Sequence, residues 1–362
     1  MRDPIKLYVV KSAGLFGRKL VPYRGEKFDK PKIWLVFGAR GSGKSSLLEV
    51  LAHVYATKNR ACIVDLFGAR DGESLAWLRH PNVKSGAWKA LLLHSPRISV
   101  KAPCDLKLYE DFCEEDLFKY DVIISAPQGY ADFDEELEAL KHATKVIYNP
   151  RRNTGRMVFL LMREAASWVY SRIRVAATQA PVKAQLIHLL REARHMNMAV
   201  GFDTQRASSM ASDVRDISDY IVFKKLTHGR LPESLRFIFE YFDLDTMYNL
   251  GVDTFVFAKD DGKVGCGIFE KPAWHLETGE ALSNLGIEFK EEPGLDEVIT
   301  SRELVQLIMQ RMDIREIAAY RKISNLEKRG FLKPIDNKKR DRVYRLADVV
   351  RAFREAYKID IL

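Results

Sequence analysis

The sequence predicts an α/β fold, in which a mostly parallel sheet is covered by helices, followed by a smaller C-terminal domain. Short apolar runs, which are typical of buried strands, alternate with amphipathic helical patterns through roughly the first 225 residues. A glycine-rich segment joins the first of these runs to a helical pattern. Beyond residue 295 the composition changes to helical patterns rich in lysine and arginine. Together these observations predict a large sheet domain and a separate basic module.

The overall composition is ordinary for a folded protein. The 362 residues are 47% hydrophobic and 30% charged, enough for a large domain and a small one. No stretch approaches the roughly 18–20 continuous apolar residues of a membrane span, and the N-terminus lacks the apolar run of a signal peptide. We therefore expect a cytoplasmic protein without membrane association. The four cysteines form no CxxC pair, which argues against a metal cluster or a disulfide framework.

Continuous apolar runs are predicted to form the parallel strands, because such strands are buried on both faces. The runs are Ile33–Phe37, Cys62–Leu66, Val122–Ser125, Lys145–Tyr148, Val158–Met162, Ala199–Asp203 and Tyr220–Phe223. Two further β-rich runs in residues 254–270, joined through Asp-Asp-Gly, predict a hairpin. We expect a motor-sized domain over residues 1–277 with its core in 30–270, a polar linker over 278–294, and a second domain over 295–362.

Residues 38–45 have the sequence GARGSGKS, which matches GxxxxGK[ST] at every position between a predicted strand and a predicted helix. Its glycines let backbone N–H groups turn toward phosphate oxygens, where the positive end of the helix dipole also points. Lys44 is expected to contact the β- and γ-phosphates of ATP, and Ser45 to bind Mg²⁺. The alternative is a glycine-rich turn that matches by chance. The motif and its flanks predict a P-loop NTPase of the RecA-like type, with a nucleotide site made of Gly38, Ala39, Arg40, Gly41, Ser42, Gly43, Lys44, Ser45 and Ser46.

The strand around residues 157–162 ends in Arg163-Glu164, where an Asp-Glu pair is usual in such enzymes. Glu164 is a candidate general base. Arg163 puts a cation in the place of the metal-side aspartate. Either the metal shell is completed elsewhere, for which Asp65 at the end of the second strand is the candidate, or hydrolysis is weak. The alternative is a buried strand that ends in a surface ion pair.

The strand around residues 199–203 ends in Thr204-Gln205. A glutamine here can contact the γ-phosphate or its attacking water. Arg194 lies eleven residues earlier, at the exit of the preceding helix, from where it could stabilise a neighbouring subunit's phosphoryl group as an arginine finger. Arg191 and Arg206 are nearby alternatives, and spacing alone favours a solvated helix face for each of these arginines.

The order of GARGSGKS, an apolar strand ending in Glu164, Arg194 and then Gln205 resembles the HerA/FtsK superfamily of DNA-pumping ATPases. Residues 189–225 carry most of this resemblance, which covers roughly residues 30–270. It implies a homo-oligomer, typically a hexameric ring, with nucleotide between subunits and double-stranded DNA in a central pore. It also implies that Lys44 and Ser45 bind nucleotide and Mg²⁺.

The same resemblance implies that Glu164 activates water, Gln205 senses the γ-phosphate and Arg194 acts in trans. Neither the N-terminal β-barrel of HerA nor the membrane region of the cell-division pumps and conjugative coupling proteins is recognisable. The chain is therefore most similar to small archaeal, viral or mobile-element members, for which a nuclease, capsid or recombination partner is possible.

The basic C-terminal region resembles a winged helix. Residues 314–329 are the predicted recognition helix, and residues 331–346 a two-stranded wing that turns near Asp336-Asn337. Between Arg315 and Arg345 there are eleven Lys or Arg and four Asp or Glu residues, and such clustered charge is typical of phosphate contact. The alternative is a winged helix used for protein contact. The predicted DNA contacts are Arg315, Arg321, Lys322, Lys338, Lys339, Arg340 and Arg342.

These features favour an ATP-driven translocase or packaging-type motor that acts on double-stranded DNA. One alternative is an initiator or loader of the AAA+ kind, which the predicted hairpin at 254–270 disfavours because that class carries a helical lid there. The other is a DNA-binding regulator that binds ATP but hydrolyses it weakly, which the unusual Arg163 keeps open.

Overall fold

The computed structural model describes residues 4–13, 17–67, 72–148, 155–164, 179–205, 212–227, 231–276, 282–291, 298–335, 342–359 and 361. The chain divides into two compact units. The first contains residues 1–94 and 101–288, and the second contains residues 95–100 and 289–362. None of the helices within the described ranges is long and apolar enough to cross a membrane.

The first unit is built on a twelve-stranded sheet with the order β2-β1-β13-β12-β11-β3-β10-β9-β4-β8-β5-β7. Neighbouring strands are parallel from β11 to β7 and antiparallel from β11 to β2. Its strands are β1 Ile5–Ala13, β2 Gly17–Pro22, β3 Ile33–Phe37, β4 Cys62–Phe67, β5 Ala90–His94, β7 Asp105–Leu108, β8 Val122–Ile124, β9 Val158–Met162, β10 Met198–Thr204, β11 Tyr220–Phe223, β12 Thr254–Lys259 and β13 Val264–Phe269.

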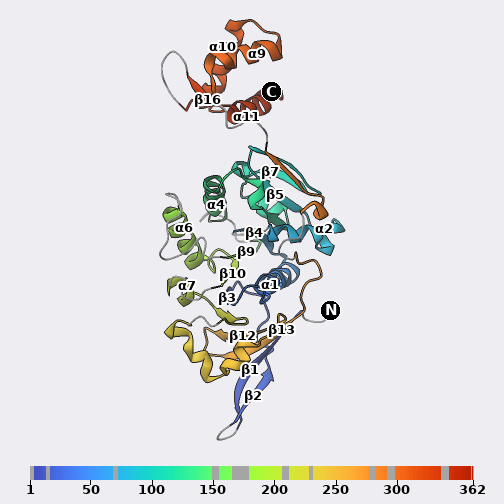
Figure 1. The fold of residues 1–362 in the computed structure, drawn as a ribbon, viewed down its shortest axis with the longest axis vertical. Helices are drawn as coiled ribbons and strands as arrows, with labels where there is room; N and C mark the ends of the chain where they lie inside the picture. Colours follow the sequence, from blue (N-terminus) through green and yellow to red (C-terminus); the bar gives the residue numbers. More distant parts are fainter. Residues whose placement is uncertain are drawn as a thin grey trace. The chain divides into compact units, whose positions relative to one another are not determined.

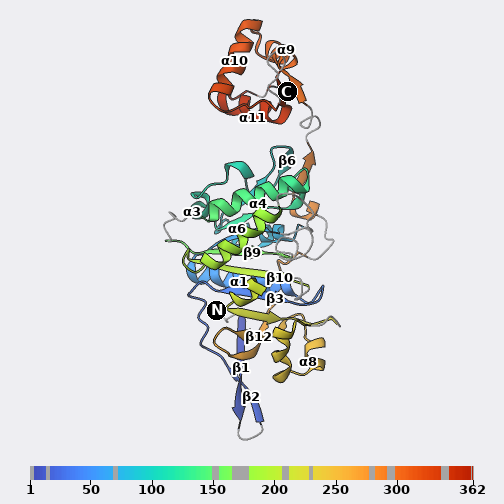
Figure 2. The same ribbon diagram turned by 90° about the vertical axis from the view of Figure 1, so that its left-hand side faces the viewer.

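Helices cover both faces of the parallel strands. Helix α1 lies on one face, and α4 and α6 lie on the other, where they run side by side (Figures 1 and 2). All side chains of β3, β9 and β10 are buried, as expected for strands covered on both faces. The helices are α1 Lys44–Asn59, α2 Pro81–Lys84, α3 Asp116–Lys119, α4 Phe133–Ile147, α6 Gln179–Glu192, α7 Ser212–Asp216 and α8 Leu244–Tyr248, with 3₁₀ helices η1 Glu73–Arg79, η2 Tyr109–Asp111, η3 Pro127–Gly129, η5 Glu233–Glu240 and η6 Leu282–Leu285.

The predicted α/β fold is confirmed, including the glycine-rich loop between β3 and α1 and the hairpin formed by β12 and β13. Among the predicted strands, Lys145–Tyr148 is wrong, because residues up to Ile147 form the last turn of α4. The N-terminus of α4 is capped by Asp132, whose carboxylate accepts the Glu135 N–H at 2.8 Å. The apolar run at 145–148 therefore belongs to the end of an amphipathic helix.

The strands β1, β2, β5 and β7 were not predicted from the sequence. Strands β1 and β2 form a hairpin that extends the antiparallel side of the sheet through β13 (Figure 2). In β1 the buried residues Ile5, Leu7 and Val9 alternate with more exposed ones, the period of a strand with one solvated face. A search for continuous apolar runs misses this alternation.

The second unit is mainly helical. It contains β15 Val298–Thr300, α9 Ser301–Met312, α10 Glu316–Lys328, β16 Val343–Arg345 and α11 Leu346–Tyr357. Thr300 and Glu303 form a capping box at the start of α9. The core joins α9, α10 and α11 through buried side chains that include Ile308, Ile323 and Phe353.

Helix α10 confirms the predicted helix at 314–329, but the winged helix remains a prediction. Strand β16 pairs with β15, which precedes α9, whereas the expected wing strand before the turn is absent from residues 331–335. Ile335 nevertheless donates its N–H to the Val343 oxygen at 2.7 Å. The predicted turn at Asp336-Asn337 lies outside the described residues.

The domain boundaries also remain a prediction. The segment expected as a linker, 278–294, contains η6 and the strand β14 Glu288–Glu291, which pairs with β6 Ile98–Lys101.

Candidate functional site

The glycine-rich loop connects the end of β3 to the start of α1 at Lys44. Gly41 and Gly43 have φ angles of +71° and +84°, a left-handed conformation that glycine adopts without steric cost. Gly43 is the N-cap of α1, and it gives the helix no side-chain cap; the first turn also carries no acidic residue. The first N–H groups of this sixteen-residue helix are thus left for an anion.

Polar groups of the loop are arranged for the same kind of ligand. The Ser42 hydroxyl is buried and has no hydrogen-bond partner among the described residues. The Lys44 ammonium is largely buried and donates to the Ala39 carbonyl of its own loop at 3.0 Å. A Cβ added to Gly41 would meet no atom within 4 Å. An unpartnered hydroxyl, a lysine and an uncapped helix start fit the phosphates of a nucleotide.

The loop is packed against a turn that precedes β12. A Cβ added to Gly43 would lie 2.3 Å from the Val252 carbonyl oxygen, so only glycine fits here. The buried Lys224 side chain holds this turn, because its ammonium donates to the carbonyls of Val252 at 2.7 Å and Thr254 at 2.6 Å. Burial lowers the pKa of Lys224 to about 7, although nearby Asp253 raises it. No sequence pattern indicates this role of Lys224, because it depends on a turn 28 residues away.

Glu164 and Gln205, predicted as base and sensor, are brought together at the carboxyl ends of the adjacent strands β9 and β10. The Gln205 amide donates to the Glu164 carboxylate at 2.8 Å. Glu164 has a φ of +47°, which is unusual for a residue with a side chain. Its N–H donates to the Asp203 carboxylate at 2.6 Å, and this bond helps to hold the strained conformation. Gln205 thus follows the strand next to β3, and Glu164 follows the strand beyond it.

Asp203 is a site residue that the sequence analysis missed. It lies within β10, is 2% exposed and has its carboxylate near Lys44. Burial raises the pKa of Asp203 to about 6, although Lys44 and the Glu164 N–H both lower it. The sequence does carry a signal for Asp203, because it is an acidic residue inside a strand. The other residues of that strand are apolar or small, apart from the last one.

Arg163 is buried, not at the surface, and is surrounded by three carboxylates. Its guanidinium donates to Asp65 at 2.7 Å, to Glu49 at 2.9 Å and to Glu73 at 3.1 Å. The Arg163 side chain is 1% exposed. Coulombic attraction to Asp65 and Glu49 outweighs burial and raises the pKa of Arg163 above its ordinary value. The alternative interpretation of this strand end, a surface ion pair, is therefore wrong for Arg163.

Asp65, the predicted metal ligand, has both carboxylate oxygens engaged by protein donors. Oδ1 accepts from the Arg163 Nε at 3.1 Å, and Oδ2 accepts from the Arg163 Nη2 and from the Trp77 indole at 2.9 Å. No group of three or more His, Cys, Asp or Glu side chains arranged to hold a metal occurs among the described residues. A magnesium ion bound with a nucleotide needs only one or two protein ligands, since phosphates and water supply the rest. The Ser45 hydroxyl, beside the Glu73 carboxylate, fits that requirement.

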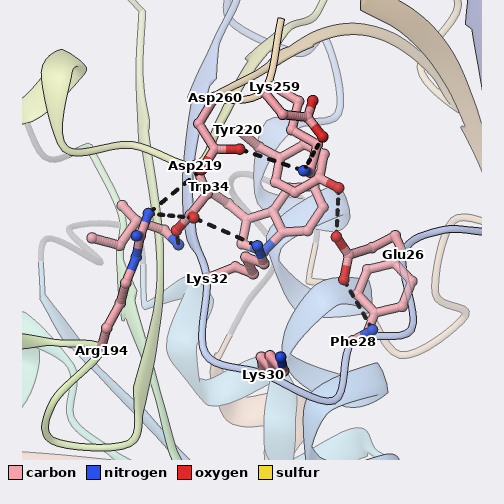
Figure 3. Close-up of polar contacts among 12 residues, drawn as sticks. Glu26, Phe28, Lys30, Lys32, Trp34, Arg194, Asp219, Tyr220, Lys259 and Asp260 are labelled. Carbon is pink, nitrogen blue, oxygen red and sulfur yellow. Dashed lines mark hydrogen bonds and ion pairs between the residues drawn. The ribbon is translucent and has the colours of Figure 1, made fainter. Parts of the chain in front are cut away.

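Arg194 lies at the amino ends of the parallel strands, whereas the glycine-rich loop lies at their carboxyl ends. Its guanidinium bonds to Asp219, which also accepts the Ile33 N–H at 2.7 Å and lies 3.6 Å from the Lys32 ammonium (Figure 3). Ile33 begins β3, and Asp219 directly precedes β11. The Arg194 side chain is 54% exposed. A role for Arg194 in trans remains a prediction; Arg206, one of its alternatives, lies outside the described residues.

The predicted DNA contacts in the second unit differ in their surroundings. Arg315 and Arg321 are exposed at the start and in the middle of α10. The Lys322 ammonium lies over the Tyr357 ring, 4.0 Å from its centroid, and Arg342 pairs with Glu327. The remaining predicted contacts lie outside the described residues: Lys338, Lys339 and Arg340.

Comparison with known proteins gives structural similarity only. No protein-family model and no curated protein matches the chain. A structure of the genome packaging NTPase B204 from Sulfolobus turreted icosahedral virus 2 in complex with ATPγS is 17% identical, covering 66% of this chain and 97% of that one, with a TM-score of 0.35.

Two further structures have the same level of similarity. The pCW3 conjugation coupling protein TcpA is 12% identical over 75% of this chain and 67% of its own, with a TM-score of 0.37. The cytoplasmic domain of the Thermomonospora curvata type VII secretion ATPase EccC is 10% identical over 74% and 26%, with a TM-score of 0.38. These values are too low to transfer a function to this chain.

Replacing Asp203 by Asn is expected to remove a pH-dependent cost of folding. The carboxyl has a pKa of about 6 in the folded chain and an ordinary value of 3.8, so the folded state loses relative stability as pH rises through this window. Asn keeps the oxygen that accepts the Glu164 N–H but carries no charge. The free energy of unfolding of Asp203→Asn relative to the parent should therefore increase between pH 4 and 7, by on the order of 2–3 kcal/mol.

Urea unfolding at several pH values measures this difference. Asp134→Asn, an exposed change on α4, is the control and should give a nearly constant difference. A constant difference for Asp203→Asn as well would contradict the assignment.

Proposed function

We propose that the chain is an ATPase whose nucleotide phosphates bind at the loop of residues 38–45. The observation that carries this proposal is the uncapped start of α1. There the buried Ser42 hydroxyl has no hydrogen-bond partner within the described part of the chain, and Lys44 donates to the Ala39 carbonyl of its own loop. On binding, Lys44 would exchange the Ala39 carbonyl for phosphate oxygens, which are better partners for an ammonium group. Ser45 would hold Mg²⁺, which supplies charge neutralisation at the phosphates.

Hydrolysis would use the bonded pair Glu164 and Gln205. The Glu164 carboxylate is exposed and can accept a proton from an attacking water, while the Gln205 amide orients both. Asp203 holds the Glu164 backbone, so the base is fixed before nucleotide binds. The charge of Arg163 is balanced by three acids and does not place an unpaired cation beside this base.

We further propose that ATP hydrolysis drives a motor of the HerA/FtsK kind on double-stranded DNA. The β12–β13 hairpin continues the sheet beyond β11, where an AAA+ initiator would have a helical lid. Arg194 lies at the amino ends of the parallel strands, and the nucleotide loop of the same subunit lies at their carboxyl ends. A phosphate contact by Arg194 would therefore have to be with a neighbouring subunit. The hairpin disfavours the AAA+ alternative, and the exposed Arg194 supports a ring in which each nucleotide lies between subunits.

Helix α10 is the proposed DNA-contacting element of the second unit. Its exposed residues include Arg315 at its N-cap and Arg321, with the apolar Ile317 and Tyr320 between them. Arginines suit phosphates and base edges, and apolar side chains suit thymine methyl groups. This mixed, exposed face distinguishes α10 from a merely solvated charged helix.

A regulator that binds ATP but turns it over slowly is the second candidate. The observation that favours it is Arg163, which replaces the usual metal-side carboxylate at the end of β9. In such a protein, nucleotide would change DNA affinity without sustained hydrolysis.

The Lys44→Ala variant is expected to lose ATP binding and steady-state ATP hydrolysis, because the phosphates lose their principal cation. In the parent protein, hydrolysis should increase with the length of added duplex DNA, since a translocase completes more steps on a longer track. Phosphate release is measured on duplexes of increasing length at constant base-pair concentration. Unchanged hydrolysis in Lys44→Ala rules out the ATPase assignment, whereas negligible turnover with nucleotide-dependent DNA affinity favours the regulator.

The Arg194→Ala variant is expected to bind ATP but lose hydrolysis, because a neighbouring site loses its arginine. Mixing it with Glu164→Gln should restore part of the activity, since some interfaces then combine an intact base with an intact arginine. Arg191→Ala is the matched control and should hydrolyse normally. Thermal melting of Arg194→Ala checks that the variant still folds when Lys32 alone pairs with Asp219. No recovery on mixing two folded variants argues against action in trans.

The double variant Arg315→Ala/Arg321→Ala is expected to bind duplex DNA more weakly and with less salt dependence. If both side chains neutralise phosphates, the slope of log affinity against log salt should decrease by about 2. Arg302→Ala/Arg311→Ala, on α9 of the same unit, removes the same charge and serves as the control. Equal losses in both double variants would mean that α10 has no special role.

A further inference from the structure

The three carboxylates around Arg163 differ in what else they can bind. They come from different elements: Glu49 from α1, Asp65 from β4 and Glu73 from the start of η1. The side chains of Glu49 and Asp65 are 0% exposed, whereas that of Glu73 is 21% exposed. Only Glu73 therefore combines contact with the guanidinium and access from outside the core.

The hydrogen bonds of the two buried acids are complete. Glu49 accepts from Arg163 on Oε1 at 2.9 Å and contacts the His275 ring on Oε2 at 2.7 Å. Asp65 uses both oxygens for Arg163 and Trp77. A metal ion could reach either carboxylate only by breaking a buried ion pair, which is costly.

Glu73 is directed to the phosphate loop. Its Oε2 accepts from Arg163 at 3.1 Å, and the Ser45 hydroxyl lies beside its carboxylate. A serine that ligates a metal through an oxygen lone pair still has its O–H proton to donate. A carboxylate that accepts this proton orients the lone pair toward the metal and makes the oxygen a better ligand.

We propose that Glu73 is the metal-side carboxylate of this site: it orients Ser45 and completes the shell of the nucleotide-bound Mg²⁺, in place of the aspartate that Arg163 replaces. Arg163 is then a positioning residue, since it contacts Glu73 and would not contact the metal. This inference rests on the proposed nucleotide site and names the residue that gives that site its metal preference.

The local charge balance supports this assignment. One guanidinium among three carboxylates leaves a net charge of −2 if all are ionised, next to a site proposed for a polyanion. A divalent cation between Glu73 and the phosphates would compensate that charge. The single positive charge of Lys44 would not compensate it.

The test is the magnesium dependence of nucleotide binding, measured on the full chain with a fluorescent ATP analogue in EDTA and in Mg²⁺. In Glu73→Gln, which keeps the size of the side chain, affinity in EDTA should be unchanged, because Lys44 and the α1 N-terminus are intact. Affinity in Mg²⁺ should fall about tenfold or more, the usual effect of removing a carboxylate that orients a metal ligand. Glu73→Asp should recover part of this loss.

Glu240→Gln, an exposed change on η5, is the matched control and should behave as the parent. Thermal melting of each variant separates a metal role from a structural one. Parent-like magnesium dependence in Glu73→Gln overturns the proposal. An equal loss in EDTA and Mg²⁺ with a lower melting temperature also overturns it, because Glu73 would then only balance Arg163. If the parent itself binds no nucleotide in either condition, the proposed function falls with it.

Discussion

The buried guanidinium of Arg163 is the interaction on which the candidate site depends. It bonds to carboxylates from α1, β4 and η1 and itself extends from the end of β9. Burying Glu49 and Asp65 without a cation would be strongly unfavourable, and removing one partner of a buried ion pair typically costs about 3–5 kcal/mol. The residue that looks like a defect in the acidic motif is thus what allows the neighbouring acids to exist in the core. It also fixes η1 against the helix that carries the phosphate loop.

A second ion-pair group secures other strands, β3 and β11, at their amino ends. Asp219 accepts the Ile33 N–H and bonds to Arg194, and Lys32 lies beside it (Figure 3). The amino ends of β3 and β11 are therefore held together by a side chain, while their carboxyl ends carry the loop and Lys224. Because the strands are parallel, the residues proposed to bind this subunit's own nucleotide lie at their carboxyl ends, and this structural group lies at their amino ends. Arg194 has a structural role here whether or not it also acts on a neighbour.

The sequence was most informative where function depends on adjacent residues. The loop at 38–45, its strand and its helix are local, and Gln205 follows its strand directly, so the periodicity and motif sufficed for them. Glu73 and Asp203 could not be assigned, because their roles come from contacts with Ser45 and Glu164 that the fold creates. The error at Lys145–Tyr148 has a related cause: a short apolar run fits a strand or a buried helix end equally well, and the capping residue that decides lies a dozen residues earlier.

The packing around η1 explains how Glu73 can be held without being fully buried. Trp77, one turn further along η1, is fully buried, donates to Asp65 and packs on Trp274 with ring centroids 4.5 Å apart. His80 stacks on Trp88 at 4.4 Å, and burial lowers the pKa of His80 to about 4, so this aromatic cluster is uncharged at neutral pH. The anchoring is therefore apolar, and the charges remain confined to the group around Arg163. Trp274 is followed by His275, which contacts Glu49 on α1. Movement of residues 274–275 would therefore disturb contacts with both η1 and α1.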